Sequence, residues 1–376
     1  MLVSFGDQES SPIHKNFARK LPKTALNCIM VVTALVTGGS GFVAAQLVNL
    51  LLESKQNVHT TVRSLANESK CRCLLEMQKR YPGQLKLFEC DLLIPGSFDA
   101  AMEGCTVVHH VASPFLLPEK IKDGQSQLVK PALDGTRNVL ASVNKTESVS
   151  RVVMTSTIGA IFGDYIDVHK MKDQTLSEDY FNTTSSVINN PYHYSKVIAE
   201  KEAWETNKRQ NRWSLVCINP GMVLGPSLTG NSDSGSLFLL DEMLKGYFFY
   251  GMANLSLATV DVREVAQAHL AAAEKEEAHG RYILCDVEMS SFVNISRILR
   301  KVHSRPYLLP RNQVPDFLVR TIGPLFGLSQ EYMRAHLGIR FKIDNYRSIK
   351  ELGIKYRPIE ETLRDHYNSW VEQRKK

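Results

Sequence analysis

The sequence predicts an α/β protein in which helices cover both faces of a doubly wound parallel sheet. Two observations carry this prediction. Short β-branched runs alternate with amphipathic helical stretches from residue 31 onward, and a glycine-rich turn follows the first of these runs. With 376 residues, 43% of them apolar and 22% charged, the chain can build one large, well-buried domain and a smaller one.

Six buried strands are expected before Pro220, because each is a short run rich in β-branched residues. They cover residues 31–37, 57–62, 85–90, 106–111, 151–156 and 213–218. The first helix is expected at 42–52, where Val43, Leu47, Leu50 and Leu51 form one apolar stripe. Further helices are expected near residues 97–103, 125–145 and 194–210. Two halves of three strands each would give the doubly wound arrangement.

The regular alternation weakens after Pro220. Gly, Ser and Asn cluster at 225–236, which is typical of a loop. Helices near 236–246 and 262–275 follow, then a short strand at 281–285, and the pattern of the remaining chain is mostly helical.

Composition argues against several classes of protein. The net charge of +6 is mild, and the basic residues are scattered rather than gathered into a stripe, so no nucleic-acid partner is expected. No apolar run reaches the roughly 18 residues that a membrane span needs, so no membrane association is expected. The seven cysteines lack metal-ligand spacing and indicate free thiols in a reducing, cytoplasmic setting. His109 and His110 have no such spacing either, and no metal is predicted.

The glycine-rich turn predicts a dinucleotide site. The first strand runs into Thr37-Gly38-Gly39-Ser40-Gly41-Phe42-Val43-Ala44. Glycines at such a junction let the backbone turn sharply and approach a pyrophosphate, and the following helix N-terminus offers N–H groups to the anion. The expected phosphate-binding residues are Gly38, Ser40, Gly41, Phe42 and Val43. This position between a strand and a helix indicates a Rossmann fold.

The end of the second strand predicts the choice of cofactor. A residue about 20 positions beyond the glycines decides it, because an acid there binds the ribose hydroxyl and repels a 2′-phosphate. This chain has Arg63 instead, with Lys70 nearby. A guanidinium suits a phosphate, so NADPH (NADP⁺ when oxidised) is the expected cofactor.

A tyrosine and a lysine one helical turn apart predict the catalytic chemistry. Tyr192 and Lys196 lie at positions i and i+4 of an expected helix and therefore share a face. The ammonium is expected to lower the pKa of the phenol, with help from the positive cofactor ring, so that Tyr192 can act as a general acid. A third hydroxyl is expected from the end of the 151–156 strand, where Thr157 is favoured over Ser156.

These motifs resemble the extended short-chain dehydrogenases/reductases, in particular the dihydroflavonol reductases, cinnamoyl-CoA reductases and fungal methylglyoxal reductases. The resemblance covers the chain from about residue 31 and rests on the glycine turn, Arg63, Tyr192 and Lys196. It rests further on the stretches Cys90-Asp91-Leu92, Val111-Ala112-Ser113-Pro114, Asn219-Pro220-Gly221 and Val260-Asp261-Val262-Arg263.

The resemblance implies further contacts with the cofactor. Asp91 and Leu92 would meet the adenine, while Val111, Ala112 and Ser113 would line the ribose and nicotinamide. Pro220 and Val223 would hold the carboxamide side, and Lys196 would also bind the nicotinamide ribose. Relatives usually carry Ser as the catalytic hydroxyl, so Thr157 is a departure that keeps the hydroxyl and adds a methyl group.

The predicted division of the chain has three parts. Residues 1–30 form a disordered extension, for which a tail, an upstream start and a transit peptide are the alternatives. Residues 31–224 form the NADP-binding Rossmann domain with the catalytic residues. Residues 225–376 form a mainly substrate-binding, mostly helical domain, from which the strand near 281–285 and some helix return to the Rossmann core.

The functional hypothesis is an NADPH-dependent reductase that passes a hydride to the carbonyl of a small aldehyde or ketone, as a monomer or homodimer. Phe115, Tyr165, Phe238 and Met243 are expected to line the substrate pocket. An NAD-dependent nucleotide-sugar epimerase or dehydratase, or a 3β-hydroxysteroid-type dehydrogenase, is the alternative on the same fold. A non-catalytic cofactor sensor is a third reading, which the intact Tyr192 and Lys196 disfavour.

Overall fold

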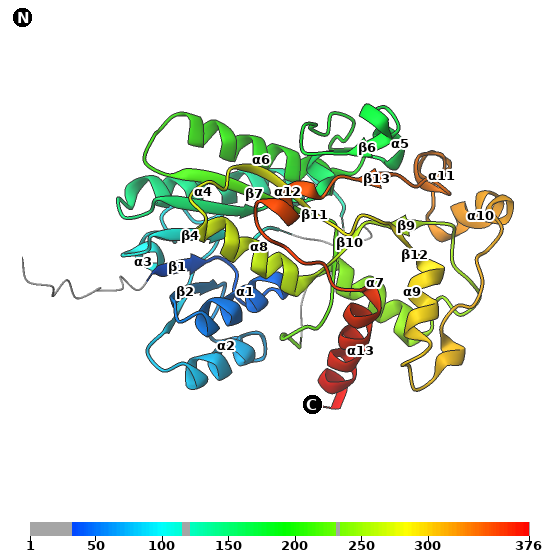
Figure 1. The fold of residues 1–376 in the computed structure, drawn as a ribbon, viewed down its shortest axis with the longest axis horizontal. Coiled ribbons are helices and arrows are strands. Elements are labelled where there is room, and N and C mark those ends of the chain that lie inside the picture. Colours follow the sequence, from blue (N-terminus) through cyan, green and yellow to red (C-terminus); the bar gives the residue numbers. More distant parts are fainter. Residues whose placement is uncertain (1–31, 115–120, 231–233, 376) are drawn as a thin grey trace, which may run out of the picture. The chain divides into compact units, whose positions relative to one another are not determined.

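The computed structural model describes residues 32–114, 121–230 and 234–375. At its centre is a seven-stranded sheet in the order β11-β7-β5-β4-β1-β2-β3 (Figure 1). All neighbouring strands in it are parallel. The strands are β1 (Thr33–Val36), β2 (Asn57–Val62), β3 (Leu85–Glu89), β4 (Val107–His110), β5 (Arg151–Thr155), β7 (Ser214–Pro220) and β11 (Gly280–Leu284).

The strand order runs outward from β1 in both directions, so the predicted doubly wound Rossmann fold is confirmed. The six strands expected before Pro220 all form, and the short strand expected near 281–285 becomes the seventh, at the edge beside β7. In such a sheet the connections leave a crevice outside the carboxyl ends of β1 and β4, where the order reverses.

Helices cover both faces of the sheet (Figure 1). On one face α3 (Asp99–Met102), α4 (Lys130–Lys145) and α6 (Pro191–Lys208) enclose a core, and on the other lie α1 (Phe42–Glu53), α2 (Glu68–Arg80) and α8 (Val262–Glu274). Strand residues alternate between the two cores: in β5, Val152 and Met154 face the first, and Val153 faces the α8 side.

Helix α2 was not predicted from the sequence. Its fully buried stripe consists of Cys71, Leu74 and Met77 alone, and apart from Cys73 and Leu75 the rest of the helix is polar or charged. Such a narrow apolar stripe is a weak periodic signal.

The remaining elements form a smaller group beside the carboxyl ends of the strands. Helices α7 (Gly235–Lys245), α9 (Phe292–Leu299) and α13 (Ile359–Lys375) share one apolar core. Short strand pairs join β8 (Met222–Leu224) to β10 (Thr259–Asp261), β9 (Ser256–Leu257) to β12 (Ser290–Ser291), and β6 (Thr175–Leu176) to β13 (Lys342–Ile343). The shorter helices are α5 (Tyr165–Val168), α10 (Asp316–Ile322), α11 (Gln330–His336) and α12 (Tyr346–Lys350). Strands of two or three residues are too short to carry a periodic signal.

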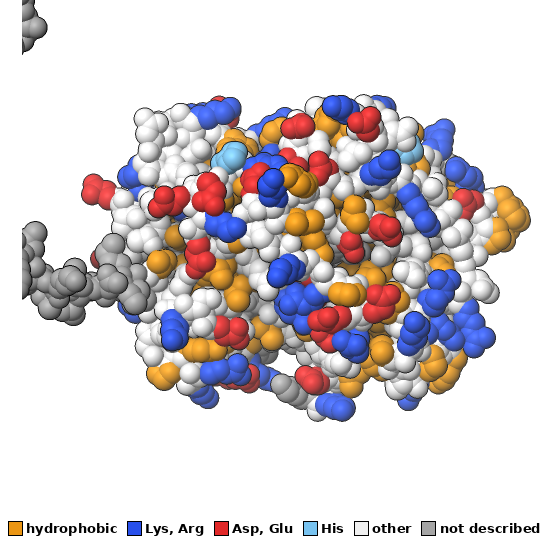
Figure 2. All heavy atoms as spheres, viewed as in Figure 1, with side chains coloured by type: hydrophobic (Ala, Val, Ile, Leu, Met, Phe, Trp, Pro, Cys, Tyr) orange, Lys and Arg blue, Asp and Glu red, His pale blue; other side chains and the backbone are white. Residues whose placement is uncertain are grey.

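Two features concern the surface of the described part. Acidic and basic side chains are interspersed over the face shown in Figure 2. Among the described residues, no helix combines the length and apolar character needed to cross a bilayer.

The predicted extension at 1–30 and the expected pocket residue Phe115 lie outside the described residues.

A histidine pair is buried between the sheet and α8. His109 of β4 and His269 of α8 approach each other with 3.4 Å between their Nδ1 atoms, and His269 Nε2 lies 2.8 Å from Thr155 Oγ1. Both side chains are fully buried. Burial lowers the pKa of His109 to about 3 and lowers that of His269 well below its usual value. Both rings are therefore neutral in the folded protein at neutral pH.

We expect stability to fall as the pH is lowered from 6.5 to 5.5. An unfolded histidine takes up a proton below about pH 6.5, whereas these buried rings do not, so the unfolded state binds more protons in this window. The His269→Gln variant should reduce the slope of unfolding free energy against pH by about 1 kcal/mol per pH unit, measured by urea unfolding. The exposed His279→Gln is the matched control and should keep the wild-type slope.

Candidate active site

The turn between β1 and α1 forms a cradle of backbone. Gly38 adopts φ +73°, a conformation that favours glycine, and its N–H donates to Thr61 Oγ1 at 3.0 Å. A Cβ atom at Gly39 would collide with the side chain of Thr60. Gly41 caps α1 without a side-chain hydrogen bond, so the N–H groups of the first helical turn are left for an anion.

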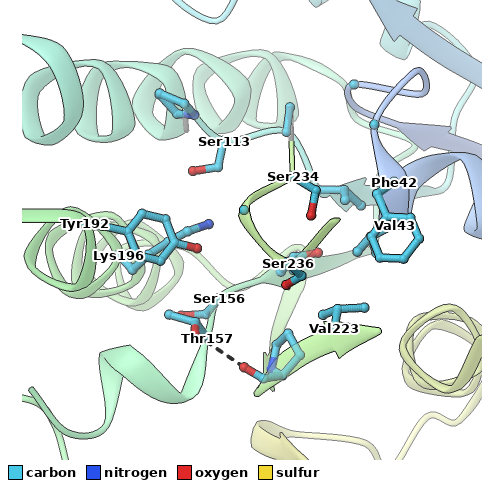
Figure 3. Close-up of a pocket in the computed structure, with 18 of the residues that line it drawn as sticks. Phe42, Val43, Ser113, Ser156, Thr157, Tyr192, Lys196, Val223, Ser234 and Ser236 are labelled. Carbon is cyan, nitrogen blue, oxygen red and sulfur yellow. Dashed lines mark hydrogen bonds between the residues drawn. The ribbon is translucent and has the colours of Figure 1, made fainter. Parts of the chain in front are cut away.

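One cavity of about 930 Å³ lies along the carboxyl ends of the central strands (Figure 3). The structure brings all of the residues predicted to bind the cofactor or to act in catalysis to its wall. These are Gly38, Ser40, Gly41, Phe42, Val43, Arg63, Lys70, Asp91, Leu92, Val111, Ala112, Ser113, Thr157, Tyr192, Lys196, Pro220 and Val223. Which ligand atoms they contact stays a prediction.

One end of this cavity carries the groups predicted to select the cofactor. Arg63 is exposed directly after β2, and Lys70 lies in the first turn of α2, which Asn67 caps. Asp91 follows β3, and its Oδ1 accepts the Leu93 N–H at 2.8 Å. The adjacent Leu92 packs so closely over Gly135 that a Cβ there would lie 3.0 Å from it. Two basic side chains, an acidic one and the apolar Leu92 therefore line the same cavity.

Helix α6 holds the predicted proton donor and its lysine. Asn190 caps the helix from a left-handed conformation, and Pro191 occupies the first helical position. Tyr192 and Lys196 therefore lie one turn apart on the face that lines the cavity (Figure 3). The Lys196 Nζ atom is 6.0 Å from the centre of the Tyr192 ring.

Burial, rather than a neighbouring charge, has the largest effect on the pKa values of Tyr192 and Lys196. It raises the pKa of Tyr192 to about 12 and lowers the pKa of Lys196 to about 8. Desolvation of the phenolate is the dominant effect on the pKa of Tyr192, and the lowering expected from Lys196 together with the positive cofactor ring stays a prediction. At neutral pH Tyr192 carries its proton, which is the state that a proton donor needs.

The structure separates the roles of the two neighbouring hydroxyls at the end of β5. Ser156 is buried and donates its hydroxyl proton to Glu200 Oε2. Thr157 is half-buried, and its hydroxyl makes only a long bond of 3.3 Å to the Pro220 carbonyl while accepting the Gly159 N–H (Figure 3). A long hydrogen bond is the easier one to exchange for a ligand oxygen, which favours Thr157.

Aromatic side chains form the wall beyond Tyr192. Tyr165 lines the cavity, as expected, and donates its hydroxyl to the Ser256 carbonyl at 2.8 Å. Its ring lies 4.7 Å from that of His336, which stacks at 4.2 Å on Tyr332. We call this set, with Phe162 and His193, the aromatic wall, and each member lines the cavity.

Two expected pocket residues do not reach the cavity. Met243 is fully buried in the core of α7, α9 and α13, and Phe238 is 40% exposed on the outside of α7. The prediction was wrong because α7 points its first residues, Ser234 to Ser236, at the cavity rather than its side. Tyr332 and His336 were missed because no local pattern shows that α11 returns to this site.

Comparison with known proteins decides the family. Residues 34–285 match the model of the NAD dependent epimerase/dehydratase family. The chain belongs to this family. A cinnamoyl-CoA reductase (CAD2) of Medicago truncatula is 32% identical over 343 residues, 90% of this chain and 95% of the relative. An anthocyanidin reductase of Vitis vinifera is 36% identical and covers 76% of this chain and 83% of its own length.

Solved structures of reductases support the same family assignment. Yeast methylglyoxal/isovaleraldehyde reductase Gre2, complexed with NADPH, matches with a TM-score of 0.73 at 26% identity, covering 92% of this chain and 99% of its own. Gre2 of Candida albicans, also with NADPH, matches with a TM-score of 0.72 at 28% identity over 91% of this chain and 99% of its own. The predicted resemblance to extended short-chain dehydrogenases/reductases is confirmed, and with it the prediction of an oxidoreductase.

Proposed function

We propose that this family member is an NADPH-dependent reductase that adds a hydride to the carbonyl carbon of a small aldehyde or ketone, with Tyr192 as the proton donor. The observation that carries the proposal is the meeting of Tyr192, Lys196 and Thr157 on the same cavity as the glycine cradle. Neither set of residues alone would support reduction, because the fold is shared by proteins with other activities.

NADPH is the cofactor of this reductase, and the residues present fit it. Gly38 to Val43 offer the backbone cradle for a pyrophosphate, and Arg63 and Lys70 line the cavity where a 2′-phosphate would lie. Both Gre2 structures hold the same cofactor. When bound, NADPH supplies the hydride.

The protein's own residues handle the proton and the developing negative charge. The Thr157 and Tyr192 hydroxyls orient the substrate by hydrogen bonds to its carbonyl oxygen. Tyr192 then donates its proton to that oxygen, and the Lys196 ammonium stabilises the phenolate that remains. Because the pKa of Lys196 is about 8, the ammonium form prevails at neutral pH.

The aromatic wall supports a substrate with an apolar or planar body beside its carbonyl group. Tyr165, Tyr332 and His336 present ring faces and edges within the cavity, and such surfaces bind flat groups through stacking.

The location that we propose for the protein is the cytoplasm. The six cysteines of the described part are free thiols, which supports this proposal.

The Tyr192→Phe variant should lose about 10²- to 10⁴-fold in kcat, because it removes the general acid but keeps the ring. The measurement is NADPH oxidation, followed by its absorbance, against a panel of aldehydes and ketones. Tyr194→Phe is the matched control, since Tyr194 lies on the same helix and does not line the cavity. Equal turnover by the two variants would contradict the assignment of Tyr192.

The Arg63→Asp variant should change the preference of the enzyme from NADPH toward NADH. Loss of hydrogen bonds to a charged group costs about 1.5–3 kcal/mol, which predicts a roughly 10- to 100-fold higher KM for NADPH. Arg72→Asp makes the same change at an exposed site on α2 that does not line the cavity, and it should leave both KM values unaltered. An unchanged NADPH preference in Arg63→Asp would count against this cofactor.

The Thr157→Val variant keeps the shape of the side chain and removes its hydroxyl, so kcat should fall about 100-fold. Thr157→Ser keeps the hydroxyl and should retain most of the activity. Ser156→Ala should cost much less than Thr157→Val, because the Ser156 hydroxyl is bound to Glu200. The reverse order would assign the catalytic hydroxyl to Ser156.

A further inference from the structure

A buried ion pair lies behind the catalytic helix and is not among the residues assigned to the site. Glu200 of α6 and Arg281 of β11 are joined by a 2.6 Å contact between Oε1 and Nε, with side chains 0% and 7% exposed. Burying two charges costs free energy unless further hydrogen bonds satisfy them. Glu200 also accepts from Asn219 Nδ2 at 3.1 Å and Trp204 Nε1 at 3.3 Å. The carboxylate is therefore held from four segments, Ser156 included.

Two of these partners lead directly to the predicted catalytic hydroxyl. Ser156 precedes Thr157 in the chain and donates to Glu200. Asn219 Nδ2 is shared between Glu200 and the Thr157 carbonyl, to which it is 3.0 Å away. The next residue, Pro220, accepts the Thr157 hydroxyl. Glu200 thus fixes both backbone segments that determine where this hydroxyl lies.

Arg281, the other member of the ion pair, is bonded to the segment that precedes the aromatic wall. The Arg281 guanidinium donates to the carbonyls of Glu178, Tyr180 and Ala160, and it lies 4.0 Å from the ring of Phe181. Ala160 belongs to the short turn between Thr157 and Phe162. Arg281 therefore connects the segment that carries the wall to the strand next to β7.

We propose that Glu200 is a positioning residue for the reduction, which, through Ser156, Asn219 and Arg281, holds the Thr157 hydroxyl in register with Tyr192 and Lys196. The proposal rests on the proposed function, because it assigns Glu200 a part in the same reaction. A pair that served only stability would not need to bridge the end of β5, the end of β7 and helix α6 at the point where the cavity begins.

Glu200 also acts on Lys196 electrostatically. The two residues lie one turn apart on α6, and the carboxylate raises the pKa of Lys196 against the larger, lowering effect of burial. The other titratable groups near Lys196 are Tyr192 on the same helix and His110 on β4, whose own pKa burial lowers to about 3, with Arg281 and Cys217 behind Glu200. His110 is neutral at working pH, so the carboxylate is the group that favours the ammonium.

The first test is Glu200→Gln, which keeps the shape and removes the charge. We expect kcat to fall about tenfold or more with little change in the KM for NADPH, since the variant disturbs orientation at the reacting centre. The alkaline limb of the kcat profile should move to lower pH by about half a unit or more, because Lys196 then loses its proton more easily. An unchanged kcat in Glu200→Gln would overturn the proposal, and an alkaline limb that stays in place would refute the electrostatic effect on Lys196.

A second pair of variants separates positioning from stability. Glu200→Gln leaves Arg281 as an unpaired buried charge and can lower the folded fraction. The double variant Glu200→Gln/Arg281→Met removes that charge together with the bonds from Arg281 to three carbonyls, so it should recover part of the thermal stability without recovering kcat or the position of the alkaline limb. Return of activity together with stability would show a purely structural role and end the proposal.

Ser156→Ala gives a third, milder test that leaves no charge unpaired. We expect kcat to fall several-fold, and the melting temperature to fall by about as much as in the control variant. Its matched control is Ser142→Ala, which also removes a buried serine hydroxyl that donates to a carboxylate, that of Asp99, outside the cavity wall. Equal kcat in the two variants would contradict the role of the Ser156–Glu200 bond.

Failure of the proposed function has a different signature. If the wild-type protein turned over no carbonyl compound, the reductase assignment would fail. The electrostatic effect of Glu200 on Lys196 would then still be measured from NADPH binding, followed by the cofactor's fluorescence across pH. A midpoint that shifts to lower pH in Glu200→Gln supports the link, and an unchanged midpoint refutes it.

Discussion

The parallel direction of the main sheet is the constraint on which the rest of the structure depends. Every strand of such a sheet ends at the same edge, and the order reverses between β1 and β4, so the connections part there and leave a crevice. The glycine cradle follows β1, Arg63 follows β2, Asp91 follows β3, and Thr157 follows β5. Residues far apart in sequence meet in one cavity because each stands at the same point of its own strand.

Desolvation gives this cavity its chemical character. It holds the proton on Tyr192 and weakens the hold of Lys196 on its own proton, which are opposite effects of the same burial on an acid and a base. A buried carboxylate one turn further along α6 counteracts the second effect. In the proposed reaction, three side chains at i, i+4 and i+8 on a single helix therefore divide proton donation, charge stabilisation and orientation among themselves, and helix geometry places them on one face.

Most of the sheet and the cavity could be predicted from the sequence, because the signals are local. A glycine turn between a strand and a helix, or Tyr192 and Lys196 at helical spacing, can be recognised within eight residues. Helix α2 could not, since its apolar stripe is too narrow. The pKa of Tyr192 and the part played by Tyr332 and His336 depend on what folds against them from far along the chain, which no local pattern contains. The errors at Phe238 and Met243 have the same origin: an amphipathic helix reveals that it has a buried face, but not which neighbour that face meets.

The Glu200–Arg281 ion pair connects residues that local sequence patterns predict with residues that only the fold brings to the site. Glu200 is bonded to Ser156 and Asn219, which border or contact Thr157, and Arg281 is bonded to the segment that leads into the aromatic wall. Protein interiors are close-packed, so a displacement of a side chain in the aromatic wall also displaces the residues packed against it. Under the proposed role of Glu200, a substrate that displaces Phe162 or Tyr165 would act on a segment bonded by Arg281 to the carboxylate that holds the Thr157 segment. The fit of the substrate body and the rate of proton transfer would then depend on the same buried ion pair.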